Sequence, residues 1–141
     1  MLKQPIVRTI FAIALGAIAG ALSRYYLGLV IAQYLGSEMP YGTLIINVTG
    51  CFFMGFLTVL SSGQVVSIHP DIRLLLLTGF LGSYTTFSSY ELDSAKLLQH
   101  RRLEPGLLYW MGSTVLGFIS LQLGIVLAEW SLNKLERKRS G

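Results

Sequence analysis

Charged residues are scarce in this chain. Asp, Glu, Lys and Arg make up 13% of its 141 residues, about half of the roughly 25% found in soluble domains. The single cysteine, Cys51, lies inside an apolar segment, which excludes a disulfide framework. His69 has no second histidine or cysteine at metal-ligand spacing, which argues against a transition-metal site. With no serine–histidine pairing, phosphate-binding loop or metal cluster in the sequence, we expect the protein not to be an enzyme.

Long apolar segments take up nearly all of the sequence. The chain is 52% hydrophobic with a mean hydropathy of +0.60, and its four apolar segments cover about residues 6–34, 42–61, 72–99 and 105–130. At about 1.5 Å of rise per residue, each is long enough to cross a bilayer as a helix. The first segment lacks a small-residue cleavage site and leads into further segments, which favours a membrane helix over a removed signal peptide. We therefore expect an all-α membrane protein of the cell membrane, with residues 1–141 forming one four-helix transmembrane domain.

The basic residues lie at the ends of these segments. The net charge is +4 and the isoelectric point is near 9.4, values that also occur in nucleic-acid-binding proteins. However, Lys and Arg residues next to apolar segments are typical of membrane proteins, and little sequence remains for a soluble domain. We therefore expect the lipid bilayer, and no nucleic acid, as the partner of these charges.

The distribution of positive charge gives little orientation preference. With four spans, both termini and the middle connection share one side, which has seven of the Lys and Arg residues. The other side has four, namely Arg24, Lys96, Arg101 and Arg102, but four of the seven on the first side lie in the C-terminal tail. A nearly balanced positive-inside signal permits insertion in both directions, and many transporters contain inverted halves. An antiparallel homodimer would supply the missing inverted half.

Residues 78–91 lie in the middle of the third apolar segment and are unusually polar for that position. They include two glycines and a run of hydroxyl-bearing residues between Ser83 and Tyr90. Polar or irregular backbone at membrane depth is tolerated only where protein or a water-lined pathway satisfies it. We therefore predict that the third helix is broken at its centre, near residues 82–85, and that the protein is a small membrane permeation protein.

The predicted break and the residues after it offer chemistry for ions of both signs. Carbonyl groups released from a broken helix need partners, and several of them around a two-fold axis would form a hard-oxygen site for a small alkali cation. Phe87 and Tyr90 are three residues apart and share one helix face, so their positive ring edges can stabilise an anion weakly, as a conduction pathway needs. The hydroxyls of Thr86, Ser88, Ser89 and Ser113 could donate to a small, strongly hydrated anion. Packing of the aromatic residues in lipid is the alternative.

Two further polar residues allow either a structural or a functional role. Asn47 lies about one turn inside the second segment, where a buried amide needs a partner; it either joins two helices or directs its N–H donors into a pore. Gly16 and Gly20 form a small-xxx-small pattern that permits close helix approach, and Arg24 follows on the same helical face with two tyrosines beside it. Arg24 is either an interfacial arginine in an aromatic belt or a cation at the mouth of an anion path.

Three blocks of sequence resemble the Fluc/CrcB family of fluoride channels: GALSRY at 20–25, GTLIINVTG at 42–50 and GFLGSYTTFSSYE at 79–91. The length, the number of spans and the order of the blocks agree as well, so the resemblance covers essentially the whole chain. It implies an antiparallel, dual-topology homodimer with two fluoride pores and a central structural Na⁺. Two positions depart from the family pattern: Tyr90 stands where phenylalanine is usual, and Ser83 stands where a second glycine is common.

The resemblance also implies roles for individual residues. The backbone carbonyls of Gly82 and Thr85 would hold the Na⁺, and Arg24 would lie near the mouth of the pore. Hydroxyls of the fourth helix would complete a polar track. The positions that compete for this track are Tyr109 or Trp110, and Ser113 or Thr114. The residues expected along the fluoride pathway are Asn47, Phe87, Tyr90, Ser88, Thr86, Ser113, Arg24 and Tyr109.

The leading functional hypothesis is passive, fluoride-selective export that lowers cytoplasmic fluoride. The negative-inside potential drives an anion outward with about 2.3 kcal/mol per charge per 100 mV, so no coupling ion or ATP is required. The alternative is a small dual-topology exporter that couples protons to a cation or drug, which needs a carboxylate at membrane depth. The first, second and fourth segments have none at their centres, and Glu91 lies beyond the polar middle of the third. A non-transporting scaffold would not explain residues 78–91.

Overall fold

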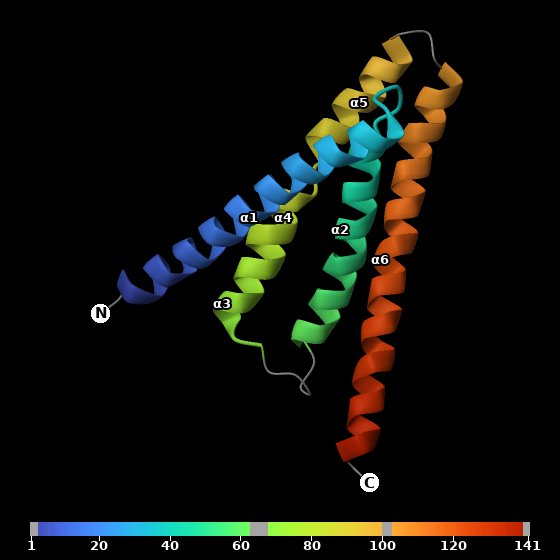
Figure 1. The fold of residues 1–141 in the computed structure, drawn as a ribbon. Helices are drawn as coiled ribbons and strands as arrows, with labels where there is room; N and C mark the ends of the chain where they lie inside the picture. Colours follow the sequence, from blue (N-terminus) through green and yellow to red (C-terminus); the bar gives the residue numbers. More distant parts are fainter. Residues whose placement is uncertain (1–2, 63–67, 100–102, 140–141) are drawn as a thin grey trace.

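In the part of the chain that the structure describes, the regular structure is entirely helical. The computed structural model describes residues 3–62, 68–99 and 103–139 (Figure 1). Arg101 and Arg102, which enter the count of positive charges, lie outside the described residues. In chain order, the helical elements are α1 (Lys3–Leu35), α2 (Tyr41–Ser62), α3 (Pro70–Arg73), the π-helix η1 (Leu74–Leu81), α4 (Gly82–Tyr84), α5 (Phe87–Gln99) and α6 (Leu103–Arg139).

Three of these helices are apolar and long enough to cross a membrane. The stretches are Ile6–Leu35, Tyr41–Ser62 and Leu103–Lys138, judged by length and composition alone. Gly36 follows α1 with a φ of +80°, a left-handed conformation that glycine adopts without strain after a helix end. The charged residues that follow the fourth apolar segment are also helical, and α6 continues to Arg139. An all-helical protein with three membrane-capable helices is thus the confirmed part of the predicted fold.

The third expected span is divided into two pieces. α3, η1 and α4 follow one another from Pro70 to Tyr84, and α5 begins at Phe87. Between them, Thr85 has φ −81° and ψ 156°, an extended conformation, whereas Gly82 is still helical. The predicted break is therefore present, at the C-terminal end of the interval expected from the sequence. Because the break divides the segment, neither piece has the length of a single span.

Glycines bring α1 into direct contact with η1. A Cβ atom on Gly20 would collide with the carbonyl oxygen of Phe80. From the other side, a Cβ atom on Gly79 would lie 2.6 Å from the carbonyl oxygen of Ile13 and 2.9 Å from the Cα of Gly16. The close approach expected from the pattern of Gly16 and Gly20 is confirmed, and it places the first helix against the segment that leads into the break.

α2 and α6 lie side by side (Figure 1). A Cβ atom on Gly124 of α6 would collide with the carbonyl oxygen of Phe52, and one on Gly55 of α2 with that of Leu121. Ser120 Oγ donates to the carbonyl oxygen of Val48 at 2.8 Å, which adds a hydrogen bond between the two helices. These small and polar residues let two apolar helices pack backbone to backbone.

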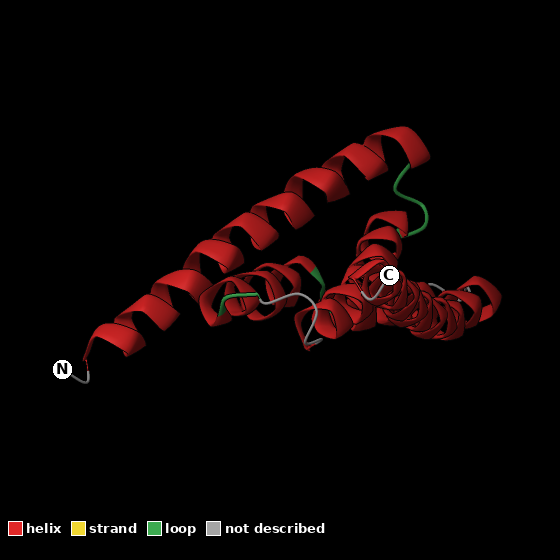
Figure 2. Cartoon of the chain, turned by 90° about the horizontal axis from the view of Figure 1, so that it is seen from below, coloured by secondary structure: helices red, strands yellow, loops and turns green. Residues whose placement is uncertain are grey.

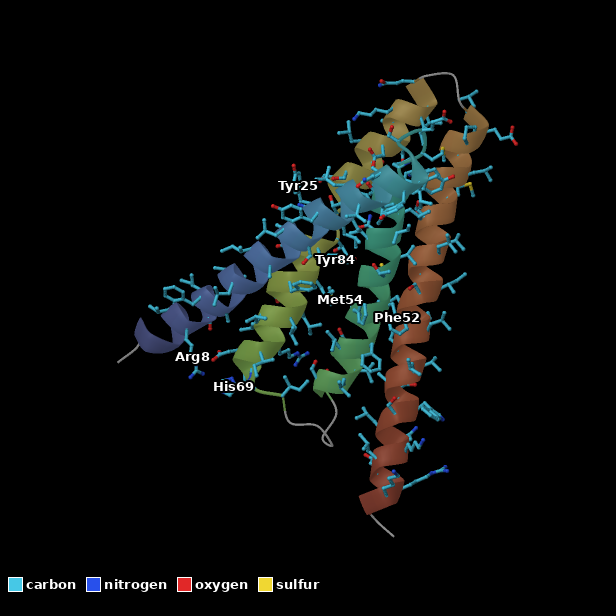
Figure 3. All side chains as sticks on the ribbon, in the orientation of Figure 1. Arg8, Tyr25, Phe52, Met54, His69 and Tyr84 are labelled. Atoms are coloured by element: carbon cyan, nitrogen blue, oxygen red, sulfur yellow. The ribbon has the colours of Figure 1, made fainter. Side chains whose placement is uncertain are left out.

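The helical segments alternate in direction. The start of α1, the end of α2 and the end of α6 lie toward the lower part of Figure 1, and α3 begins there as well, whereas α5 ends at the top, where α6 begins. Seen from below, α1 lies along one side of the other helices (Figure 2). At the lower end, Arg8 of α1 forms an ion pair with Asp71 of α3, close to His69 (Figure 3). The divided segment from Pro70 to Gln99 therefore runs between the same two ends as the long helices.

Candidate functional site

Asn47 holds the broken backbone of the third segment. Its Nδ2 donates to the carbonyl oxygen of Thr86, and its Oδ1 accepts from the N–H of Thr86, both at 2.8 Å. A buried backbone group left without a partner would cost about 1–3 kcal/mol. Of the two roles that the sequence leaves open for Asn47, these hydrogen bonds establish the joining of two segments. One Nδ2 hydrogen remains for a second acceptor, so a place along an ion pathway stays a prediction.

The break deprives two carbonyl groups of their helical donors. In a continuous helix the N–H of Thr86 would donate to the carbonyl of Gly82, four residues earlier, but here it donates to Asn47. In the same way the N–H of Ser89 would donate to the carbonyl of Thr85, but it donates to Thr86 Oγ1 at 3.2 Å. Gly82 and Thr85 are the residues that the family resemblance assigns to Na⁺, and their carbonyl oxygens are hard ligands that fit a small alkali cation. The Na⁺ site itself stays a prediction.

The hydroxyl of Thr86 caps the start of α5. Thr86 Oγ1 accepts the N–H of Ser89, donates to Ser89 Oγ at 3.0 Å and lies 3.3 Å from Ser88 Oγ. A side-chain oxygen in this position stabilises a helix by about 0.5–2 kcal/mol. The Thr86 hydrogen, which the sequence suggests as a donor to an anion, is thus directed to Ser89. Ser88 is exposed in the chain.

A cavity of about 470 Å³ lies beside the break, where α2, α5 and α6 meet. None of the described residues that line it carries a charged side chain, and Arg24, Ser88 and Tyr109 lie outside the lining. Phe87 is 74% exposed, so its ring lies at the surface of the single chain. The cavity brings together more than half of the residues expected along the fluoride pathway. These are Asn47, Thr86, Phe87, Tyr90 and Ser113.

Aromatic rings form a row along this cavity. The ring centroids of Phe87 and Tyr90 are 5.7 Å apart with the planes at 46°, and those of Tyr90 and Tyr109 are 5.9 Å apart at 39°. Because the rings are tilted, each ring presents both its positive edge and its negative face to neighbouring groups. The hydroxyl of Tyr90 donates to the carbonyl oxygen of Trp110 in α6 at 2.6 Å. The ring of Tyr90 therefore borders the cavity, while its hydroxyl is directed at a helix backbone.

Two buried hydroxyls of α6, Tyr109 Oη and Ser113 Oγ, have no hydrogen-bond partner among the described residues. They are four residues apart and so lie on one face of the helix. Trp110, by contrast, is 44% exposed, and Thr114 Oγ1 donates to the carbonyl oxygen of Trp110 at 3.0 Å. By burial Tyr109 is directed inward and Trp110 outward, whereas Ser113 and Thr114 both border the first cavity. Which of these four residues belong to a polar track stays a prediction. A buried hydroxyl without a partner has a donor available for a ligand.

Arg24 lies on a second cavity, also about 470 Å³ in volume, formed by residues of α1, α2, α5 and the connections between them. Thr86 borders both cavities, so both reach this residue of the break. On the wall of the second cavity, Thr43 Oγ1 donates to Asp93 Oδ2 at 2.7 Å. The sequence does not indicate this pair, because the two residues are 50 positions apart and an aspartate at the position of Asp93 is typical of the polar end of a helix. The sequence hint to this contact is that the second and third segments each have a polar side chain near membrane depth.

Three apolar helices of membrane-spanning length and a helix break closed by a side-chain amide define a helical membrane protein, in which Thr86 at the break borders two cavities. The similarity of the sequence to known proteins makes this class more specific. Residues 11–125 match the family described as CrcB-like protein, Camphor Resistance (CrcB), and the chain belongs to this family. The family expected from the three sequence blocks is therefore confirmed.

Similar proteins from several bacteria carry a functional name. A protein of Trichormus variabilis named Fluoride-specific ion channel FluC is 58% identical over 127 residues, which cover 90% of this chain and 93% of the relative. A protein of the same name from a Synechococcus strain is 55% identical over 126 residues, covering 89% of this chain and 95% of the relative. A third, from Chloroflexus aurantiacus, is 45% identical over 121 residues, covering 86% and 95%.

Replacing Asn47 with Asp should lower the free energy of unfolding by about 2 kcal/mol. The substitution keeps the acceptor for the Thr86 N–H but sets a second oxygen, in place of an N–H donor, against the Thr86 carbonyl. Thermal unfolding of the purified protein in detergent measures the loss. Asn133→Asp, the same change at an exposed position of α6, is the control. Equal unfolding midpoints for the two variants would contradict the role of Asn47 in closing the break.

Proposed function

We propose that the protein is a fluoride-selective ion channel that lowers cytoplasmic fluoride by passive export across the cell membrane. The observation that carries the proposal is the uncharged cavity that joins Asn47, Phe87 and Ser113 beside the helix break. Membership of the CrcB family supports it, as does 45–58% identity to proteins named Fluoride-specific ion channel FluC.

Groups along this cavity would bind an anion weakly and at several points. The spare Nδ2 hydrogen of Asn47 and the unpaired hydroxyl of Ser113 can donate to fluoride. Tyr109, whose ring contacts that of Tyr90, would donate from outside the described lining. The ring edges of Phe87 and Tyr90 supply weaker positive potential. No fixed positive charge is present in the described lining, so an anion is not trapped there, and weak binding at several sites permits rapid conduction.

Arg24 would act outside the narrow part of the pathway. It lies on the second cavity, which shares Thr86 with the first. A positive charge in a recess with low-dielectric walls raises the local concentration of anions, and the acidic residue Asp93 on the same cavity opposes this effect. Arg24 would therefore offset Asp93 at the mouth, and the outward driving force would come from the membrane potential.

Asp93 is the observation that favours the alternative function, a proton-coupled exporter of cations or drugs. Such an exporter needs a carboxylate that faces its substrate. The described lining of the first cavity has none, but Asp93 borders the second cavity and accepts a hydrogen bond from Thr43. Glu91, the candidate from the sequence, is exposed on α5. Fluoride flux and proton-driven cation flux separate the two functions.

We further propose that the divided segment forms a fourth span and that two chains pair antiparallel. In the single chain Phe87 is 74% exposed and Gly82 is exposed at the break, surfaces that a second copy related by a two-fold axis would cover. The carbonyls of Gly82 and Thr85 from both chains would then surround one Na⁺, which would offset the repulsion between their dipoles. A C-terminal reporter found on only one side of the membrane would contradict the antiparallel arrangement.

Fluoride efflux from proteoliposomes tests the proposed activity. With a potential set by valinomycin and a potassium gradient, we expect fast, electrogenic fluoride efflux and little chloride efflux, because the pathway has weak donors and no coupling ion. Empty liposomes are the control. Absence of fluoride efflux from folded protein would overturn the channel, and proton-driven cation flux abolished by Asp93→Asn would establish the exporter.

Phe87→Ile should reduce fluoride efflux about tenfold, which corresponds to about 1.4 kcal/mol in the barrier. The substitution removes a ring edge from the cavity but keeps an apolar side chain at a surface position. Initial efflux rates and elution from a sizing column measure activity and assembly separately. Phe11→Ile, at a 63% exposed position of α1 outside both cavities, is the matched control. A fully active Phe87→Ile protein would remove this ring from the pathway.

Replacing Na⁺ with the large cation N-methylglucamine should weaken the dimer. Without a small cation, the carbonyls of Gly82 and Thr85 would face one another across the two-fold axis without a partner, at a cost of about 1–3 kcal/mol for each unsatisfied group. The dimer fraction during dilution in detergent measures the change, and restoring Na⁺ is the control. Identical dissociation with either cation would argue against the Na⁺ site.

A further inference from the structure

We propose that Tyr90 is a positioning residue for anion discrimination, because its hydroxyl ties the ring to the backbone of α6 and leaves the ring alone to border the pathway. The inference rests on the proposed function, since it concerns the same cavity. In this role the hydroxyl does not touch the anion. Tyr90 acts through the fixed direction of the long axis of its ring and through the spacing of α5 and α6.

The hydroxyl of Tyr90 has no donor left for an anion. Tyr90 Oη lies 2.6 Å from the carbonyl oxygen of Trp110 and 3.0 Å from Thr114 Oγ1. Thr114 Oγ1 donates to the same carbonyl at 3.0 Å, and a carbonyl oxygen has two lone pairs for two such donors. The shorter distance is near the lower limit for an O–H···O hydrogen bond. Since a phenol has one hydrogen, that hydrogen is directed to Trp110.

Attachment at both ends fixes the ring in the cavity wall. The backbone of Tyr90 belongs to α5, and its hydroxyl is bound to α6, 20 residues later in the chain. The side chain is 7% exposed, and its ring lies between the rings of Phe87 and Tyr109. A phenylalanine ring would keep these apolar contacts but would have no hydrogen bond to α6. The hydroxyl therefore adds orientation and helix spacing to a ring that packing already holds.

The tied ring discriminates between anions through the spacing of α5 and α6. Because the phenol oxygen lies on the axis about which the ring rotates, packing against Phe87 and Tyr109 sets the ring plane, and the hydrogen bond sets the distance between the helices. A wall tied to α6 resists widening, so an anion larger than fluoride has to strain the hydrogen bond between Tyr90 and Trp110. Selectivity is a difference between the free energies of two ions, and this hydrogen bond penalises the larger one.

Tyr90→Phe removes the hydroxyl and keeps the ring. We expect fluoride efflux from proteoliposomes to persist and the ratio of fluoride to chloride efflux to fall about fivefold, the factor that one ordinary hydrogen bond contributes. Tyr84→Phe is the matched control, because Tyr84 Oη lies 3.0 Å from Thr49 Oγ1 and the side chain is 8% exposed. Tyr84 borders neither cavity. The control should lose comparable thermal stability and keep the wild-type efflux ratio.

Cys51 provides a second measurement that does not depend on conduction. It is the only cysteine of the chain, and it borders the same cavity as Tyr90. A ring released from α6 would let a small thiol reagent reach Cys51 more often. The reaction rate of Cys51 should therefore rise in Tyr90→Phe and remain at the wild-type value in Tyr84→Phe.

The outcomes separate this role from general stability and from the proposed function. A wild-type efflux ratio and an unchanged Cys51 rate in Tyr90→Phe would overturn the inference, even if its unfolding midpoint fell. Equal losses of discrimination in Tyr90→Phe and Tyr84→Phe would overturn it as well, because the effect would then reflect stability alone. A wild-type protein without fluoride efflux would overturn the proposed function and the role in discrimination, and the Cys51 rates would then decide whether Tyr90 positions the cavity wall.

Discussion

The paired hydrogen bonds between Asn47 and Thr86 are the interaction on which the rest of the structure depends. A helix can be interrupted inside an apolar environment only if the released backbone groups find partners. One side-chain amide supplies both, with two bonds of 2.8 Å to the same residue. Because the Thr86 N–H is then unavailable to Gly82, the same interaction that permits the break also exposes a carbonyl oxygen beside it. A cation site and an anion pathway can therefore share one interruption of the backbone.

Close helix contacts place this interruption where it can form cavities. Gly20 and Gly79 bring α1 against the segment before the break, and Gly55 and Gly124 bring α2 against α6. With these pairs in backbone contact, α5 leaves the break and meets α6 through Tyr90 and its neighbours. The space left between these elements is lined by uncharged groups, and the charged residues Arg24 and Asp93 lie on the neighbouring cavity. Charged and uncharged groups are thus divided between the two cavities.

The polarity of the sequence was sufficient to predict where the third helix breaks, but not what closes the break. Hydroxyl-rich residues in the middle of an apolar segment require partners wherever they lie, so the break follows from local sequence. Asn47 is 39 residues from Thr86, and nothing in its local sequence distinguishes a group that closes a backbone from one that faces a pore. Thr86 illustrates the same limit, since its hydroxyl is taken by the start of α5. The sequence also left open which face of α6 is directed inward, because Tyr109 and Trp110 are adjacent aromatic residues that lie on different faces of the helix.

By itself, the sequence determined the helical class, the long apolar segments, the position of the break and the family. These properties depend on composition, on hydrophobic length and on short blocks of adjacent residues, which are local quantities. Tertiary structure decided which polar groups are consumed by the protein and which remain available to an ion. The hydroxyl of Tyr90 is bound to the backbone of α6, while those of Tyr109 and Ser113 have no partner in the described chain. The physical reason is that the availability of a donor depends on acceptors brought from distant segments, and only packing places these acceptors within the 3 Å or so that a hydrogen bond requires.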